Sequence, residues 1–211
     1  AEGEENPTEF NLNSVDFTLI NPTTKRLEFM GWTGSNGETP ELNVTVPKGT
    51  SGNLTYKANW VCATFTDGTK LTYDQLRLPE NGTKYGYKAE YLKENSISET
   101  SSVRTGIFYG CNTIKTLDFP DSVKALNAYR SETFARASSL ERVSFADDIS
   151  VKNNYISFES CSKLKDVKLP ENCSGYFWYC TSIESVGPKG SGADCELKVA
   201  TLGENMFYGC T

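Results

Sequence analysis

The sequence predicts a mainly β protein, in which a small β domain precedes a solenoid of stacked repeats with a parallel sheet and short helical turns. Two observations predict the solenoid: a register of apolar residues recurs from about residue 106 onward, and a strand-like alternation ends most copies of it. A third observation, four short alternating segments before residue 61, predicts the β domain. A self-similar register indicates stacking, because a single unit cannot bury its apolar residues alone.

The repeated register consists of Phe, then Cys three residues later, Leu or Ile after three more, and Val or Leu after another three. The Phe-to-Phe steps are 26, 24, 19 and 30 residues, and leucine-rich repeats run about 20 to 29 residues. We expect these side chains to form the core of a leucine-rich-repeat solenoid. The members of the register are Phe108, Cys111, Ile114 and Leu117; Phe134, Ala137, Leu140 and Val143; Phe158, Cys161, Leu164 and Val167; Phe177, Cys180, Ile183 and Val186; and Phe207 with Cys210.

A strand is predicted at the end of each of the first three copies. A second apolar residue follows the last register position by two, as in Leu117 with Phe119 and Val143 with Phe145. Side chains two residues apart lie on the same face of a strand. The segment around residues 106–111 and its counterparts are too short for a regular helix, so each copy is expected to contain a tight helical turn.

Four of the seven cysteines occupy the same slot of the register, and Ala137 replaces Cys there once. A small buried apolar group suits both residue types, because free Cys behaves as a small hydrophobe. We therefore expect a stacked ladder of free thiols. Cys62, Cys173 and Cys195 lie outside the register, and a disulfide between one pair of them stays open. No metal site or cofactor is expected, because the chain has no Cys-x-x-Cys pair and no His.

The repeats are expected to begin at a cap over residues 62–105. Two short alternating segments flank Asp67 and Gly68, which is a turn signal typical of a hairpin. Residues 76–81 then copy residues 167–172, which predicts a degenerate first strand over about residues 71–81. Such a cap closes the open end of a solenoid.

Residues 11–61 are expected to form a separate small domain behind a polar tail of residues 1–10. Strands are predicted where apolar residues alternate, and residues 33–41 are predicted to be a polar, Gly-rich loop. A core of this size depends on large aromatics such as Trp32 and Trp60. The predicted strands cover residues 15–19, 27–32, 42–46 and 54–60.

The repeated segment resembles the BspA-type leucine-rich repeat of bacterial surface proteins. Residues 106–123 read Gly-x-Phe-Tyr-Gly-Cys-Asn-Thr-Ile-Lys-Thr-Leu-Asp-Phe-Pro-Asp-Ser-Val, close to the family pattern Phe-x-x-Cys-x-x-Leu-x-x-Val-x-Leu-Pro. The resemblance covers about residues 71–211 and departs at Ala137, at Pro188 and in the 19-residue step. It implies a surface-exposed or secreted protein, since several members of the family are adhesins or bind host proteins.

The first domain resembles the Listeria–Bacteroides repeat, also known as the internalin B-repeat. The resemblance spans about residues 12–60 and rests on Gly31 with Trp32 at one end and Ala58 with Trp60 at the other. That module is a small β-grasp-like fold of bacterial surface proteins. The resemblance therefore implies a β-grasp-like domain over residues 11–61. The leucine-rich repeats themselves are expected over residues 106–211.

Composition excludes several classes of function. The net charge of −6 disfavours nucleic acid, because no basic stripe offsets phosphate charge. No apolar run has the roughly 18 residues of a membrane helix, so no membrane insertion is expected within this chain. Without His there is no His-based triad, and no Gly-x-Ser-x-Gly context is present, so we expect no enzyme. The start at Ala1 suits a mature chain with its signal peptide removed, hence an extracellular or cell-surface location; a trimmed start is equally compatible.

The candidate ligand-binding residues are aromatic side chains beside the repeated Phe. They are Tyr109, Tyr176, Trp178, Tyr179 and Tyr208. The four consecutive aromatics at 176–179 cannot all enter one narrow core, which indicates an exposed patch for a host or microbial surface protein or glycan. The alternative is that these rings cover the edge of the solenoid or fill space left by the short repeat. The function expected is a binding or adhesion module; the alternative is a passive structural spacer in a larger surface protein.

The register predicts the cost of truncating its members. Leu164→Ala or Val143→Ala should lower the free energy of unfolding by roughly 2–4 kcal/mol, because each removes buried methyl groups and leaves a cavity. Chemical denaturation measures this directly. An unchanged midpoint in either variant would contradict the proposed register.

Overall fold

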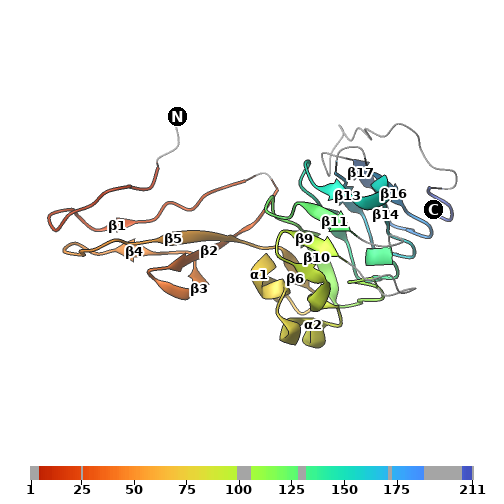
Figure 1. Ribbon diagram of the computed structural model, residues 1–211, viewed down its shortest axis with the longest axis horizontal. Helices are drawn as coiled ribbons and strands as arrows, with labels where there is room; N and C mark the ends of the chain where they lie inside the picture. The colour runs from red at the N-terminus through yellow and green to blue at the C-terminus, as the bar shows by residue number, and fades with distance from the viewer. Residues whose placement is uncertain are drawn as a thin grey trace. The chain divides into compact units, whose positions relative to one another are not determined.

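The computed structural model describes residues 5–24, 26–98, 106–127, 132–170, 173–187 and 206–210. The chain divides into two compact units, Ala1–Val61 and Cys62–Thr211 (Figure 1). Both are built mainly of short strands, so the mainly β class predicted from the sequence is confirmed. The segments that contain Pro188 and Cys195 lie outside the described residues.

The N-terminal unit holds two small antiparallel sheets. β1 pairs with β4, and β2 lies between β3 and β5. Its core is Leu19, Trp32 and Val44, and the Trp32 indole N–H donates to the side-chain oxygen of Asn21 at 2.9 Å. No helix is present in this unit among residues 5–24 and 26–61, and the β-grasp assignment stays a prediction. The strands are β1 Phe17–Thr18, β2 Phe29–Gly34, β3 Gly37–Glu41, β4 Thr45–Val46 and β5 Tyr56–Trp60.

The loop predicted over residues 33–41 was wrong, because β2 and β3 form a tight hairpin there. Gly34 and Gly37 adopt φ of 122° and 119°, a region that disfavours side chains. At Gly34 a Cβ would lie 2.2 Å from the carbonyl oxygen of Thr55.

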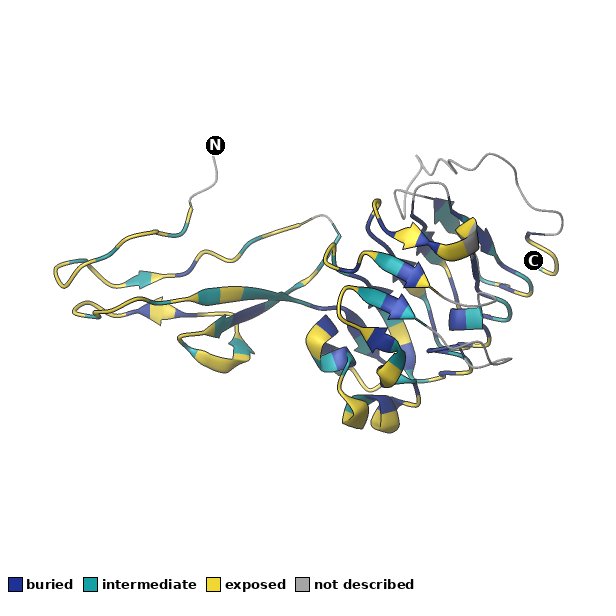
Figure 2. Cartoon of the chain, in the orientation of Figure 1, coloured by how far each residue is buried: buried dark blue, intermediate teal, exposed yellow. Residues whose placement is uncertain are grey.

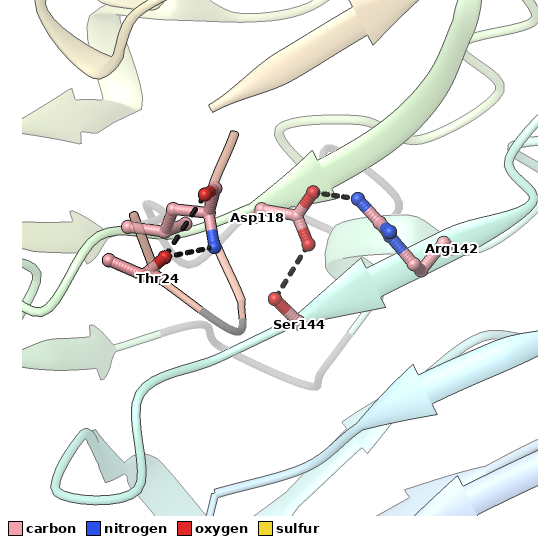
Figure 3. A network of polar contacts seen from close by, with 5 residues as sticks. Thr24, Asp118, Arg142 and Ser144 are labelled. Atoms are coloured by element: carbon pink, nitrogen blue, oxygen red, sulfur yellow. Dashed lines mark hydrogen bonds and ion pairs between the residues drawn. The ribbon is translucent and has the colours of Figure 1, made fainter. Parts of the chain in front are cut away.

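Before β2, the Thr24 hydroxyl accepts the Leu27 N–H at 2.9 Å and lies 3.0 Å from the Leu27 carbonyl oxygen (Figure 3).

The second unit begins with a hairpin of β6 Ala63–Phe65 and β7 Lys70–Leu71. Its turn is fixed by Asp67, whose carboxylate accepts the Thr69 N–H at 2.9 Å. That hydrogen bond is the main reason why the pKa of Asp67 lies below its ordinary value. β6 pairs antiparallel with the first repeat strand, so the hairpin ends the main sheet at one edge.

The degenerate strand predicted over residues 71–81 was also wrong: this segment forms two helices, α1 Tyr73–Leu76 and α2 Pro79–Tyr85. Local capping decides the outcome. The Thr72 hydroxyl accepts the Gln75 N–H, and the Gln75 side chain accepts the Thr72 N–H in return. Pro79 occupies the first turn of α2, where its missing N–H costs nothing. The strand prediction rested on the similarity of residues 76–81 to residues 167–172. That comparison did not include Thr72 and Gln75, which precede the compared segment.

The repeats stack through a parallel sheet, which confirms the prediction of a parallel-sheet solenoid (Figure 1). Leu117, Val143, Val167 and Val186 lie side by side in register across four strands. These strands are β10 Ile114–Asp118, β12 Arg142–Ser144, β15 Asp166–Lys168 and β17 Ser185–Gly187.

A second set of paired strands was not predicted. It forms a four-stranded sheet and a separate two-stranded parallel pair. The strands are two or three residues long, too short for alternation to be visible in the sequence. They are β8 Leu92–Lys93, β9 Ser96–Ser98, β11 Ala125–Asn127, β13 Ser150–Val151, β14 Tyr155–Ser157 and β16 Ser174–Tyr176; the short 3-10 helices are η1 Ala89–Tyr91, η2 Glu132–Phe134 and η3 Lys152–Asn154.

The repeated phenylalanines form one continuous column through the stack. Neighbouring rings lie 5.2–5.7 Å apart with interplanar angles of 5–13°. The column continues into the cap, where Tyr87 meets Phe108 at 5.5 Å. Figure 2 shows the buried residues concentrated along the strands of this unit. The rings of the column are Phe108, Phe134, Phe158, Phe177 and Phe207.

The register residues are fully buried in the first three copies, and some are only partly buried in the last two. Ile183, Val186 and Cys210 are partly buried and pack against the core. Phe207, expected in the core, is 40% exposed. Its ring stacks on Phe177, with the centroids 5.3 Å apart.

The thiols of the Cys slot do more than fill space, because each donates a hydrogen bond to the preceding repeat. The Cys161 thiol donates to the Phe134 carbonyl at 3.0 Å, and Cys180 to Phe158 at 3.1 Å. Cys210 and Cys111 bond to Phe177 and Tyr85 in the same way, at 2.9 and 3.3 Å. Burial raises the pKa of Cys180 to about 12, and that of Cys161 also lies well above its ordinary value, so both stay protonated donors. Cys62 and Cys173 carry thiols, not disulfides.

The thiol ladder predicts a measurable contribution to stability. Cys161→Ala should lower the free energy of unfolding by about 1–2 kcal/mol, because it removes a hydrogen bond between repeats and one buried sulfur. Chemical denaturation of the variant measures the loss.

Cys173→Ala is the matched control for this variant. Cys173 is also buried in the core, but its thiol donates its hydrogen bond to the carbonyl of the next residue, at 3.4 Å, and not to another repeat. If Cys161→Ala lowers the free energy of unfolding no more than Cys173→Ala does, the Cys161 thiol only fills space in the core.

Candidate functional site

The candidate binding residues lie on the turns that carry the repeated Phe. The residue two after each Phe has a left-handed backbone, with φ of 67°, 62°, 62°, 58° and 72° in chain order. Backbone bonds join the turns: the Tyr179 N–H donates to the Tyr208 carbonyl at 2.9 Å, and the Ser160 N–H to the Trp178 carbonyl at 2.7 Å. The residues after each Phe therefore align in two columns along the stack. The left-handed column is Gly110, Arg136, Ser160, Tyr179 and Gly209.

Four of the five candidate residues come together; we call Tyr176, Trp178, Tyr179 and Tyr208 the aromatic cluster. Tyr176 lies 5.1 Å from Trp178, and Trp178 lies 6.1 Å from Tyr208, between ring centroids. Tyr179 meets Tyr208 edge to face, at 5.7 Å and 84°. The cluster joins the end of β16 to two adjacent turns.

The members of the cluster differ in exposure. Tyr179 is 49% exposed and Tyr208 is 55% exposed. Tyr176 and Trp178 are half-buried. The outer pair, Tyr179 and Tyr208, is the part of the cluster most available to a partner.

Tyr109 lies apart from the cluster along the column. The equivalent positions between it and Trp178 are Ala135, which is buried, and Glu159. Its ring lies 5.8 Å from the guanidinium carbon of Arg136, a cation–π distance. The shared sequence position of Tyr109 and Trp178 thus does not produce a shared surface.

Tyr179 occupies its left-handed conformation at a cost. A non-glycine residue in this region loses about 1–2 kcal/mol, and glycine occupies the same column at Gly110 and Gly209. The Tyr179 ring lies directly over Gly209, where an added Cβ would come within 2.6 Å of it. The small residue at 209 makes room for the exposed ring, and strain of this kind is often kept for function.

The outer face of the main sheet carries a polar network instead. The Asp118 carboxylate accepts hydrogen bonds from Arg142 and from the Ser144 hydroxyl, the latter at 2.7 Å (Figure 3). Asp118 is buried, and both of its partners lie on β12 of the next repeat, where Ser144 is paired in register with Asp118. These groups satisfy one another, so we assign the network to repeat stacking.

Ion pairs run along the stack in the same way. Lys115 pairs with Glu141 at 3.6 Å, and Lys165 pairs with Glu184 at 3.3 Å. The adjacent acids Asp147 and Asp148 pair with Lys168 and Lys124, each at 2.7 Å. The hydrogen bond from Lys124 holds the pKa of Asp148 below its ordinary value. In the ranges that the structure describes, no cluster of Cys, Asp or Glu is arranged to hold a metal ion.

The left-handed column was missed by sequence reasoning. Gly110 and Gly209 sit two residues after their Phe and could have signalled it, but Arg136, Ser160 and Tyr179 hide the pattern. The hydrogen-bonding role of the thiols was missed because the partners are backbone atoms of another repeat.

Comparison with known proteins yields one match. A model of the BspA type leucine rich repeat region matches residues 82–211 in six copies, which is more than half of the chain. No curated protein and no solved structure matches the chain. The family match does not extend to residues 12–60, so their likeness to the Listeria–Bacteroides repeat stays a prediction. In the described part of the chain, no helix combines the length and apolar composition needed to cross a membrane.

The left-handed column predicts that glycine is tolerated or favoured there. Ser160→Gly should raise the free energy of unfolding by about 0.5–1 kcal/mol, because it relieves backbone strain. Tyr179→Gly should leave stability unchanged or higher. Thermal or chemical denaturation measures both.

The adjacent position supplies the control. Glu159 has no positive φ, so Glu159→Gly should destabilise the protein through the entropy of the unfolded chain. If Ser160→Gly loses as much stability as Glu159→Gly, the turn carries no strain.

Proposed function

The chain belongs to the BspA-type leucine-rich repeat family, whose members are non-enzymatic interaction scaffolds commonly related to surface adhesion, and on this premise we propose that it is a binding module of a bacterial cell surface. The module is secreted or surface-exposed, and it presents the turn edge of its repeats to a partner on another surface. The partner is a host or microbial macromolecule.

The exposed part of the aromatic cluster carries this proposal. Among the described residues of the unit Cys62–Thr211, four large apolar side chains are exposed, and three of them lie in the last two Phe turns: Tyr179, Phe207 and Tyr208. Exposing a group of large apolar side chains to water is unfavourable, so such a group is often part of a binding surface. Tyrosine and tryptophan are enriched where proteins bind partners.

The stack supports the proposal by holding these rings in place. The turns that bear them are joined by backbone hydrogen bonds and anchored by the buried Phe177 beneath. A rigid surface loses little conformational entropy on binding, which favours affinity. A flexible loop with the same side chains would lack this advantage.

A passive spacer is the second candidate. The Phe column, buried from Phe108 to Phe177, and the paired charges along the stack would suit a rod that only projects another part of a surface protein. A spacer gains nothing from exposed tyrosines, however, and it gives no reason for a tyrosine in a strained turn.

The test is a binding screen of the 211-residue chain against extracellular-matrix proteins and glycans. We expect specific binding that Tyr208→Ala or Trp178→Ala weakens. For a protein partner the loss should be about tenfold or more, since central aromatic residues of protein interfaces contribute about 2 kcal/mol or more. Circular dichroism and thermal denaturation establish that each variant is folded. Fractionation of the native host tests the surface location separately.

Leu78→Ala is the matched control, because Leu78 is an exposed apolar residue of the same unit outside the cluster. It should bind like the parent protein. A chain that binds nothing on the panel, or folded cluster variants that bind as well as Leu78→Ala, would favour the spacer.

A further inference from the structure

The outer pair of the cluster forms a corner of two aromatic faces. Tyr179 and Tyr208 stand nearly perpendicular, at 84°, with their centroids 5.7 Å apart. The Trp178 ring also contacts Tyr208, with the two centroids 6.1 Å apart. About half of the surface of each outer tyrosine remains exposed.

Both turns that carry the cluster lack charged residues. Residues 173–183 and 206–210 contain no Asp, Glu, Lys or Arg. The next turn along the stack carries one charge of each sign, Glu159 and Lys163, which balance. In a chain with a net charge of −6, this neutral area provides no electrostatic attraction for a charged ligand.

Hydroxyl-bearing residues occupy neighbouring positions of the same turns. Ser160 occupies the position equivalent to Tyr179 in the adjacent turn, and Ser162 and Thr181 are exposed one residue after the Cys slot. The Thr181 hydroxyl donates to the Ser162 carbonyl at 3.3 Å, so these two groups lie on neighbouring repeats. Each hydroxyl oxygen keeps acceptor capacity for another donor.

Exposed aromatic rings on uncharged turns that also carry hydroxyl residues suit a sugar. A pyranose ring has an apolar face of C–H groups, which packs on an aromatic ring, and a rim of hydroxyls, which hydrogen-bond to neutral polar groups. We propose that the aromatic cluster binds a neutral glycan, with a pyranose stacked on Tyr179 or Tyr208. This inference rests on the proposed binding function and names the ligand class of the same site.

Other ligands fit less well. A stable protein interface buries about 1,200–2,000 Å² in total, and a corner of two exposed rings provides only a small part of that area. Sulfated or sialylated glycans need cations near the stacking face, whereas the two turns of the cluster have none. The perpendicular rings also offer no flat strip for a long planar polysaccharide, so the ligand is a terminal sugar or a short branch.

The experiment probes the 211-residue chain with printed neutral oligosaccharides ending in mannose, galactose or N-acetylglucosamine. Sialylated and sulfated versions of the same glycans and a panel of extracellular-matrix proteins are probed in parallel. We expect binding to a subset of the neutral glycans. Tyr208→Ala and Tyr179→Gly should each weaken it about three- to tenfold, in line with the energy of one aromatic contact.

Tyr109→Ala is the matched control, since Tyr109 sits at the position equivalent to Tyr208 but outside the cluster. Its affinity for the glycan should stay within about twofold of that of the parent protein. The variant leaves intact the aromatic contact with the sugar, which contributes about 0.5–1.5 kcal/mol. Tyr179→Gly keeps the test sharp, because glycine removes the ring together with the Cβ atom that strains the left-handed backbone, so folding is not endangered.

The outcomes separate the two proposals. Binding to matrix proteins without neutral glycans, or preference for the acidic glycans, would overturn the glycan site and leave the binding module standing. Equal weakening in Tyr109→Ala and Tyr208→Ala would also overturn the site. A chain that binds neither glycans nor proteins would overturn both.

Discussion

The contact between successive Phe turns is the interaction on which the repeat unit depends. Each turn adds one ring to a single column, and one or two backbone hydrogen bonds join the turn to the next. The thiol of the Cys slot adds a third link, from Cys161 to Phe134 and from Cys180 to Phe158. Hydrophobic burial and hydrogen bonding are thereby satisfied at the same place, which explains why strands of only three residues stay ordered.

The same contact determines what reaches the surface. The Phe and Cys positions point into the stack. The two residues between them reach the surface in every copy except at Ala135, and the second has a left-handed backbone. The second and third copies place small, polar or charged residues at these positions, and the first copy places a single tyrosine, Tyr109, there. The last two place Trp178, Tyr179 and Tyr208 there. A ligand site of this kind needs no pocket, because the spacing of the repeats arranges the side chains.

The end of the stack that precedes the first Phe turn is closed by a cap of different structure. The hairpin of β6 and β7 pairs antiparallel with β10 and ends the main sheet, while Tyr85 stacks on Phe65 at 3.8 Å. Helix caps at Thr72 and Gly86 fix the segment between them. The cap thus covers the first ring of the column with aromatic side chains of its own, and the exposed edge of a parallel sheet is avoided.

The sequence by itself determined the repeat register, the parallel sheet and the family, because Phe, Cys and Leu recur at fixed spacing and periodicity is a local property. It also indicated the aromatic residues around Trp178. Only the tertiary structure decided that residues 73–85 are helical, that a second set of strands exists and that Tyr109 stands apart from Tyr208. The reason is physical: capping, cross-repeat thiol bonds and ring contacts join residues far apart in the chain, and spacing along one repeat does not reveal what the next repeat places beside it.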